Sequence, residues 1–233
     1  MTFERILALD TATETVSVAL LDGPRRFYQS DAQYNRHSEQ ILPFVDTVLK
    51  KSGLTLRDID AIAFGAGPGA FTGLRVACGV AQGLGWATEK PLVAVSNLEA
   101  VAVKDQFEGR ILVALDARMK ECYVAAYEVK GRFLCSTLLE ALVAKPEDLG
   151  ALCERIGATA VSGDAFNRYA DCIDLPGGVR VLEKSPATAL EIAVLAKKRA
   201  KDGKTVTALN AAPIYVRNRV ALTIDERAKG VKL

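Results

Sequence analysis

The 233-residue chain contains a single histidine, His37, and this scarcity limits the chemistry available to it. A Ser-His-Asp triad or a zinc site would have to be built around that one imidazole. General-base catalysis needs a positioned partner for the histidine, and the sequence identifies none. No nucleophile–base pair of the kind a peptidase needs can be named either. We therefore expect no catalytic residue for hydrolysis and no zinc site, whereas Asp10 and Asp116 could still hold Mg²⁺ through water.

Cysteines are few and widely spaced: Cys78, Cys122, Cys135, Cys153 and Cys172. Their odd number and spacing exclude a disulfide framework and a Cys-x-x-Cys metal or redox site. We interpret most of them as buried small hydrophobic residues in a reducing cytoplasm. No signal peptide or membrane-spanning run is visible, so the sequence predicts a cytoplasmic protein without a membrane partner.

Net charge is also small, at +2, which by itself does not indicate nucleic-acid binding. Its distribution is uneven: residues 197–233 carry ten Lys/Arg and three Asp/Glu, a balance of +7, and the remainder carries 20 against 25, or −5. A charge run of this kind is typical of a solvated helix face. The alternative is a patch that contacts an anionic partner such as RNA.

A glycine-rich stretch organises the N-terminal half. The apolar run at 61–64 reads as a buried strand, Gly65, Gly67 and Gly69 follow it, and a helix is expected from about Thr72, its candidate N-cap, to Ala87. A P-loop is excluded because residues 65–75 contain no lysine. A dinucleotide fingerprint is disfavoured because the stretch does not follow the first strand and Pro68 lacks an amide hydrogen.

Small residues recur along the helix after this loop. Gly73, Ala77, Ala81 and Gly85 form one ridge, with Gly79 and Gly83 on a second. Each glycine inside a helix costs about 1 kcal/mol of helix stability relative to alanine. We therefore expect these glycines to allow another helix to approach the backbone closely. That helix could be the one predicted over 37–52, from the spacing of Ile41, Phe44, Val45 and Val48, or part of a second protein. We expect one face to cover the chain's own sheet and the small-residue face to meet a partner.

The chain repeats itself. Residues 112–116 match 6–10 at an offset of 106, and both copies read as strand, polar turn and further strands. The predicted fold class is α/β, a duplicated actin-like or sugar-kinase-like (ASKHA) fold with a mixed sheet and flanking helices in each lobe. The predicted lobes are residues 1–105 and 106–233. In that fold a strand ending in Asp grips ATP phosphates, which makes Asp10, Thr11 and Thr13 nucleotide-binding candidates and Asp116 a weaker one. The alternative is that each Asp satisfies amides of its turn.

The string Gly67-Pro68-Gly69-Ala70-Phe71-Thr72-Gly73-Leu74-Arg75, with His37–Pro43 upstream and Pro213–Arg217 downstream, resembles the TsaB (YeaZ) family. The resemblance implies a subunit that assists formation of N6-threonylcarbamoyladenosine in tRNAs reading codons that begin with A. Its implied partners are the metal-dependent paralogue TsaD, the ATPase TsaE and tRNA, contacted indirectly or through the basic tail. It further implies a homodimer when the chain is alone.

The metal-binding His-x-Glu-x-His motif of TsaD corresponds to Asn97–Val101, where both histidines are absent. The resemblance therefore implies a non-catalytic partner with no tightly bound cofactor, although ATP or ADP could be present in the complex. It places the interface on two helices, with these candidate residues: His37, Ile41, Phe44, Val45, Val48, Gly73, Ala77, Ala81 and Gly85. Two enzyme alternatives stay open, an ATPase or phosphotransferase using Asp10 and a peptidase acting on the paralogue.

Overall fold

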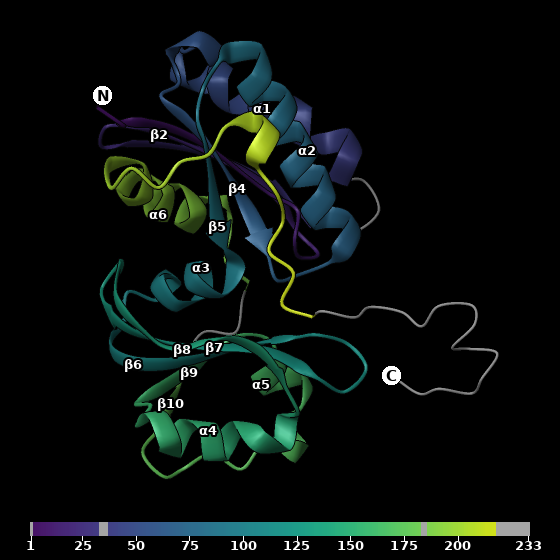
Figure 1. The fold of residues 1–233 in the computed structure, drawn as a ribbon, viewed down its shortest axis with the longest axis vertical. Coiled ribbons are helices and arrows are strands. Elements are labelled where there is room, and N and C mark those ends of the chain that lie inside the picture. The colour runs from purple at the N-terminus through teal and green to yellow at the C-terminus, as the bar shows by residue number, and fades with distance from the viewer. Residues whose placement is uncertain (1, 33–36, 183–185, 218–233) are drawn as a thin grey trace, which may run out of the picture.

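The computed structural model describes residues 2–32, 37–182 and 186–217, which form two stacked lobes, each built on a five-stranded sheet (Figure 1). The first sheet has the order β3-β2-β1-β4-β5. Its strands are β1 (Arg5–Asp10), β2 (Val16–Asp22), β3 (Arg25–Asp31), β4 (Ala61–Gly67) and β5 (Leu92–Ser96). β1, β2 and β3 pair in antiparallel fashion, and β4 and β5 extend the sheet in parallel with β1.

The second sheet repeats this plan, with the order β10-β9-β6-β7-β8. Its strands are β6 (Glu108–Asp116), β7 (Cys122–Lys130), β8 (Phe133–Ala144), β9 (Ala160–Ser162) and β10 (Arg180–Val181). Again three antiparallel strands are followed by two parallel ones, which confirms the duplicated fold. Asp10 pairs with Ser17, whereas Asp116 pairs with Cys122, so the turn of the second copy is one residue shorter.

Helices cover both sheets. They are α1 (His37–Ser52), α2 (Phe71–Thr88), α3 (Asn97–Lys104), α4 (Leu149–Ile156), α5 (Ala165–Arg168) and α6 (Ala189–Lys201), with short 3₁₀ turns at Leu56–Asp58, Pro146–Asp148, Ala170–Cys172 and Ala208–Asn210. Figure 1 shows α1 and α2 on one face of the first sheet, α6 on its other face, and α3 between the sheets. One core therefore runs through both lobes, from Ile6 and Ala8 through Leu98 and Val101 to Val113.

Local sequence signals explain the helix boundaries. α1 has the predicted bounds, and the left-handed Gly53 follows it. α2 begins earlier than expected, because its N-cap is Ala70, so the prediction that Thr72 caps this helix is wrong. α3 was not predicted, although Ser96 and Glu99 form a capping box at its start.

The chain returns to the first sheet at its C-terminal end. α6 packs Ile192 and Ala196 into the same core as Ile6. Beyond it, Leu92 of β5 and Val206 exchange backbone hydrogen bonds of 2.8 and 2.9 Å. β6 begins at Glu108, close to the expected division, yet residues 106–217 contribute to both lobes. The lobe ranges 1–105 and 106–233 stay a prediction.

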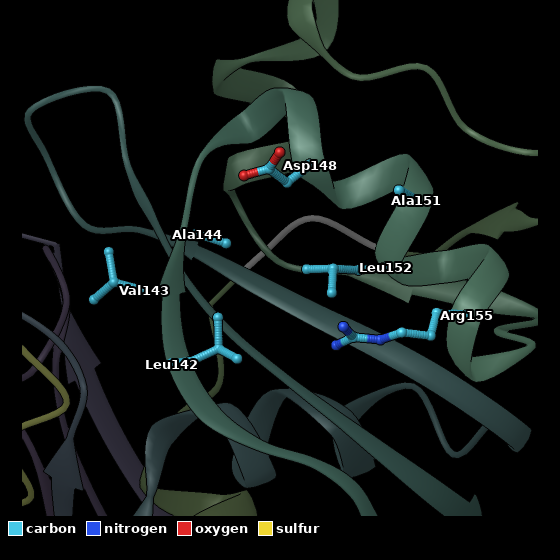
Figure 2. A pocket seen from close by; sticks show the side chains of 7 residues that line it. All are labelled: Leu142, Val143, Ala144, Asp148, Ala151, Leu152 and Arg155. Atoms are coloured by element: carbon cyan, nitrogen blue, oxygen red, sulfur yellow. The ribbon is translucent and has the colours of Figure 1, made fainter.

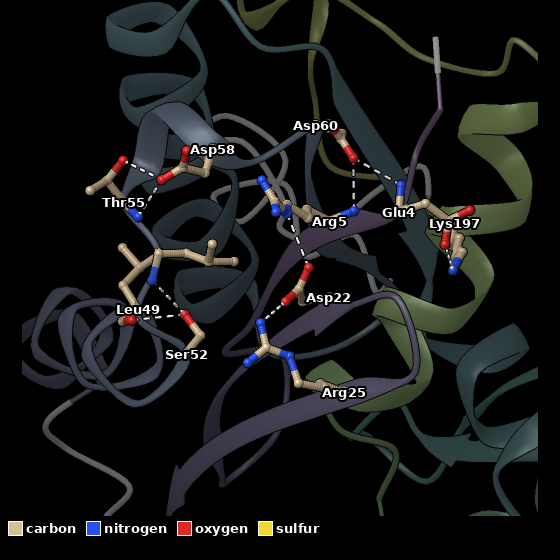
Figure 3. Close-up of polar contacts among 11 residues, drawn as sticks. Glu4, Arg5, Asp22, Arg25, Leu49, Ser52, Thr55, Asp58, Asp60 and Lys197 are labelled. Carbon is tan, nitrogen blue, oxygen red and sulfur yellow. Dashed lines mark hydrogen bonds and ion pairs between the residues drawn. The ribbon is translucent and has the colours of Figure 1, made fainter.

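Polar contacts fasten the start of β1 to its surroundings (Figure 3). The Asp60 carboxylate accepts hydrogen bonds from the amides of Glu4 and Arg5, each at 2.8 Å. Lys197 of α6 pairs with Glu4, and this bond, with a second from Lys201, lowers the pKa of Glu4 to about 2. The beginning of the chain is thereby tied to β4 and α6.

Candidate functional site

Asp10, the first nucleotide-binding candidate, ends β1 in a closed environment. Its side chain is fully buried. Its Oδ1 accepts hydrogen bonds from Asn97 Nδ2 at 3.0 Å and from the Ala12 amide at 3.3 Å, and its Oδ2 has no partner among the described residues. Burial raises the pKa of Asp10 to about 6, against the opposing effect of these two hydrogen bonds.

The glycine-rich loop fills the space beside this turn. A Cβ atom on Gly65 would lie 2.1 Å from Asp10 Oδ1, one on Gly69 2.6 Å from the Ala12 carbonyl oxygen, and one on Gly73 1.8 Å from the Thr11 carbonyl oxygen. No side chain fits at these distances, so the three glycines permit direct packing of the loop on the turn. A ligand could reach Asp10 only if the loop moved away.

The other two nucleotide-binding candidates make local contacts. Thr11 is fully buried and donates a 2.6 Å hydrogen bond from its Oγ1 to the Gly73 carbonyl oxygen. Thr13 is half-buried, and its hydroxyl group bonds the backbone of Thr15. The structure thus brings Asp10 and Thr11 together with the glycine loop. Asp116 supports its own turn, since its Oδ1 accepts the hydroxyl of Tyr169 at 2.7 Å and the amide of Arg118 at 3.0 Å.

Asn97, the first residue of α3, has a structural role that sequence reasoning missed. Its Oδ1 accepts the amide of Gly67 at 2.8 Å while its Nδ2 bonds Asp10. Val101, four residues further along α3, lies in the core. Over residues 2–32, 37–182 and 186–217, no group of three or more His, Cys, Asp or Glu side chains is placed to hold a metal ion.

The predicted interface ridge on α2 faces inward. Gly73, Ala77, Ala81 and Gly85 are all buried against the first sheet, and a Cβ atom on Gly85 would lie 2.7 Å from a methyl group of Leu92. On α1, the core likewise holds Ile41, Val45 and Val48 and packs against Phe44. The structure corrects the expectation that the buried candidates form a contact surface, because their own sheet covers them; Phe44 is half-buried, and its place in an interface stays a prediction. The side chain of His37 lies outside the described part.

The opposite face of α2 is open instead. Its exposed residues include Phe71, Arg75, Gly79, Gly83 and Trp86, which we call the α2 stripe. Trp86, the only tryptophan in the chain, is 74% exposed, and Phe71 is 44% exposed. Cβ atoms on Gly79 and Gly83 would meet nothing within 4 Å. The second ridge of the sequence pattern is therefore the accessible one.

The segment Pro213–Arg217 joins the two lobes next to this stripe. The Ile214 amide donates a 2.7 Å hydrogen bond to the Ala66 carbonyl oxygen of β4. The Tyr215 ring lies 5.9 Å from that of Phe71, and its hydroxyl accepts a 3.3 Å bond from Arg75 Nε. Arg217 reaches the second lobe, where it bonds the Ala117 carbonyl oxygen and Glu121.

Most of the basic residues that follow Lys197 in the described part of the chain form ion pairs with carboxylates. Lys197 and Lys201 pair with Glu4, Lys198 pairs with Asp202, and Arg199 pairs with Glu99. This part of the run fits the solvated helix face better than an anion-binding patch. Residues 218–233, which carry four more of the cations, lie outside the described residues.

Comparisons with known proteins decide the family. The family model described as TsaD, tRNA N6-adenosine threonylcarbamoyltransferase, matches residues 31–186. The Escherichia coli protein named tRNA threonylcarbamoyladenosine biosynthesis protein TsaB is 36% identical over 222 residues, which cover 93% of this chain and 96% of that protein. The chain belongs to the TsaB family. A Haemophilus influenzae TsaB is also 36% identical, over 92% of this chain and 94% of its own.

A crystal structure of a Pseudomonas aeruginosa protein, described as similar to peptidase YEAZ, superposes with a TM-score of 0.83. The two chains are 33% identical over 92% of this chain and 100% of the other. The string that resembles the TsaB family now has a physical explanation in this chain. Gly69 and Gly73 pack on the Asp10 turn, whereas Phe71 and Arg75 project outward beside Tyr215.

Proposed function

We propose that this chain acts in the biosynthesis of threonylcarbamoyladenosine in tRNA, as a non-catalytic subunit that binds the metal-dependent paralogue TsaD through the α2 stripe. The role in this biosynthesis rests on TsaB relatives that match nearly the whole chain. TsaD would transfer the threonylcarbamoyl group from its adenylate to tRNA. This chain would hold TsaD in an active arrangement, with the ATPase TsaE as a third component.

The exposed glycines of the α2 stripe carry the proposal. Gly79 and Gly83 sit in the middle of an 18-residue helix, where each costs about 1 kcal/mol relative to alanine. No residue within the described ranges packs into the space that their missing side chains leave. A partner helix that approaches the backbone closely would do so. Phe71, Arg75 and Trp86 flank them, and aromatic and arginine side chains are frequent energetic centres of protein interfaces.

A non-catalytic role agrees with the residues of the inter-lobe region. Asp10 and Thr11 are sealed beneath the glycine loop, so the ATPase or phosphotransferase alternative requires this loop to open. The positions of the two metal-binding histidines of TsaD hold Asn97 and Val101, both committed to packing and hydrogen bonding. We expect any ATP or ADP to be held by the complex with TsaD, and the chain alone to form a homodimer through the same stripe.

Reconstitution tests the proposal. The chain is added to TsaD, TsaE, tRNA, ATP and the precursors of threonylcarbamoyl-adenylate, and modified adenosine is measured by mass spectrometry. We expect modification to require the chain and to persist in the Asp10→Asn variant. Equally fast modification without the chain would refute the scaffold role. Loss of modification in Asp10→Asn, with normal assembly, would favour the nucleotide-binding enzyme.

A direct binding measurement uses the single tryptophan. Chain labelled with fluorotryptophan gives one fluorine resonance, from Trp86, whose environment changes when a partner covers it. We expect the resonance to shift on titration with TsaD, and the mass of the complex to correspond to a heterodimer or a multiple of it. A complex of that mass that leaves the Trp86 resonance unmoved would place the interface elsewhere.

A further inference from the structure

A recess of about 310 Å³, which we call the inter-lobe recess, lies between the start of β8 and the C-terminal half of α6. The hairpin that joins β7 to β8 contributes residues 132–137 to its lining, and α3 contributes Glu99. Small-molecule sites are frequent between lobes, and their volumes range from about 300 to 1,000 Å³. The inter-lobe recess lies at the lower end of this range, so a ligand that fits it is small.

Ion pairs account for half of the cations in the inter-lobe recess. Four of the lining side chains are cationic and two are acidic, which gives the lining a net charge of +2. Arg199 of α6 pairs with Glu99 of α3, and Lys198 pairs with Asp202. Two cationic charges in the lining therefore have no acidic partner within it.

These two charges belong to Arg132, on the β7–β8 hairpin, and Lys204, just after α6. Neither side chain forms a hydrogen bond or an ion pair within the described ranges. Lys204 is fixed through its backbone, since its amide donates a 2.8 Å hydrogen bond to the Arg199 carbonyl oxygen. A recess lined by an excess of one charge concentrates ions of the opposite sign. The inter-lobe recess is therefore suited to an anion.

An aromatic ring and aliphatic side chains make up much of the remaining lining. Phe133 follows Arg132 in the chain and is 60% exposed, although it is a large apolar residue. Leu134 and Val194 also line the recess. Aromatic rings next to cationic groups bind nucleotides, because the base stacks on the ring while the cation binds the phosphate. The lining thus favours an anion that carries a planar ring.

A second recess, between β8 and α4, does not have this excess of charge (Figure 2). Its volume is larger, about 420 Å³, and its charged lining residues are Asp148 and Arg155, which balance each other. Figure 2 shows the Arg155 side chain extending toward β8. Charge, and not volume, therefore distinguishes the inter-lobe recess as an anion site.

We propose that the inter-lobe recess binds a nucleoside monophosphate, with the phosphate group between Arg132 and Lys204 and the base against Phe133. A phosphate monoester carries a charge of about −1.5 to −2 at pH 7, which matches the two cations that lack an acidic partner. The inference goes beyond the proposed function and does not depend on it, because this chain alone supplies every residue of the recess and needs neither TsaD nor tRNA.

Two exposed cysteines test the site in the unaltered chain. Cys135 lines the inter-lobe recess, whereas Cys172 does not and serves as the internal control. The chain is alkylated with N-ethylmaleimide at increasing AMP, and peptide mass spectrometry follows each thiol. We expect AMP at ten times its dissociation constant to slow alkylation of Cys135 roughly tenfold and to leave Cys172 unchanged. Unchanged alkylation of Cys135, or equal slowing of both thiols, overturns the proposal.

Fragments of the ligand test the two parts of the recess separately. Adenosine lacks the phosphate and ribose 5-phosphate lacks the base, so each should bind about tenfold more weakly than AMP in calorimetric titrations. Adenosine that binds as tightly as AMP would overturn the role of the two cations, and ribose 5-phosphate that does so would overturn the role of Phe133. Tighter binding of a short RNA without a terminal phosphate would overturn the assignment to a monophosphate.

Charge removal tests the same residues from the side of the protein. Arg132→Gln and Lys204→Gln, each at an accessible position, should each weaken AMP binding about tenfold. Arg155→Gln is the matched control, because it removes one positive charge from the lining of the second recess, and it should bind AMP normally. Thermal unfolding checks that all three variants fold. Unchanged affinity when Arg132→Gln and Lys204→Gln are combined, or equal weakening in Arg155→Gln, overturns the proposal.

Discussion

Replacing Gly79 and Gly83 by alanine should make the monomer more stable, at protein concentrations too low for the homodimer to form. Both lie in the helical interior of α2, and a Cβ atom at either position meets nothing within 4 Å. Alanine is favoured over glycine in such a place by about 1 kcal/mol. For a chain of this size, 1 kcal/mol corresponds to a rise in Tm of about 2–4 °C. We expect the free energy of unfolding of the double variant to rise by about 2 kcal/mol and its Tm by about 4–8 °C. Urea and thermal unfolding measure the two quantities.

The same substitutions should weaken assembly with TsaD. If a partner helix packs against the glycine backbone, two added methyl groups overfill the contact, which costs about 1–3 kcal/mol. That cost corresponds to an affinity lower by a factor of about 5 to 150. Titration of the fluorotryptophan-labelled chain with TsaD measures it. Glu154→Gln, on the exposed side of α4 in the other lobe, is the control and should bind normally.

Gly73→Ala should change the stability of the chain in the opposite direction to alanine at Gly79 and Gly83. Its Cβ atom would lie 1.8 Å from the Thr11 carbonyl oxygen, so the Asp10 turn or α2 must move and the chain loses stability. A double variant of Gly79 and Gly83 that is stabilised yet binds TsaD with unchanged affinity would remove the α2 stripe from the interface. A destabilised double variant would contradict the assignment of these glycines as free of internal contacts.

Three further predictions concern the packed turn and the inter-lobe segment. In Asp10→Asn the buried charge is gone. The wild-type carboxyl has a folded pKa of about 6 and an unfolded value of 3.8, so it binds its proton more readily when folded, and this favours the folded state at low pH. Wild-type stability relative to the variant should therefore fall by about 3 kcal/mol as pH rises from 3.8 through 6, measured by urea unfolding at several pH values; a difference independent of pH would contradict this. Thr11→Val should lower the free energy of unfolding by about 1–3 kcal/mol, because it removes the 2.6 Å hydrogen bond to the Gly73 carbonyl oxygen. Thr11→Ser keeps the hydroxyl group and should lower the free energy of unfolding less. Equal losses of stability in the two variants would show that the hydrogen bond is unimportant. Arg217→Ala should speed hydrogen exchange of residues 117–121, since the side chain bonds both Ala117 and Glu121; unchanged exchange would show that the segment does not hold the second lobe.

Local periodicity in the sequence was sufficient to predict much of the fold. The spacing of Ile41, Val45 and Val48 predicts α1 with its observed ends, and the 106-residue repeat predicts two related sheets. It was insufficient for the orientation of α2, because both ridges of that helix consist of small residues. The choice between them depends on Thr11 and Leu92, which lie outside the helix in sequence and contact only one ridge. The role of Asn97 depends equally on a distant residue, Asp10, 87 positions away.

The distances around the glycines separate those that folding requires from those that binding explains. Gly65, Gly69 and Gly73 each have a backbone or carboxylate atom within 3.0 Å of the place where a Cβ would stand, so the monomer alone accounts for them. This close packing also seals Asp10 and makes its turn part of the core. Gly79 and Gly83 have no such neighbour among the described residues, and no contact there compensates for their cost in helix stability. We therefore propose that a second protein lies against the outer face of α2.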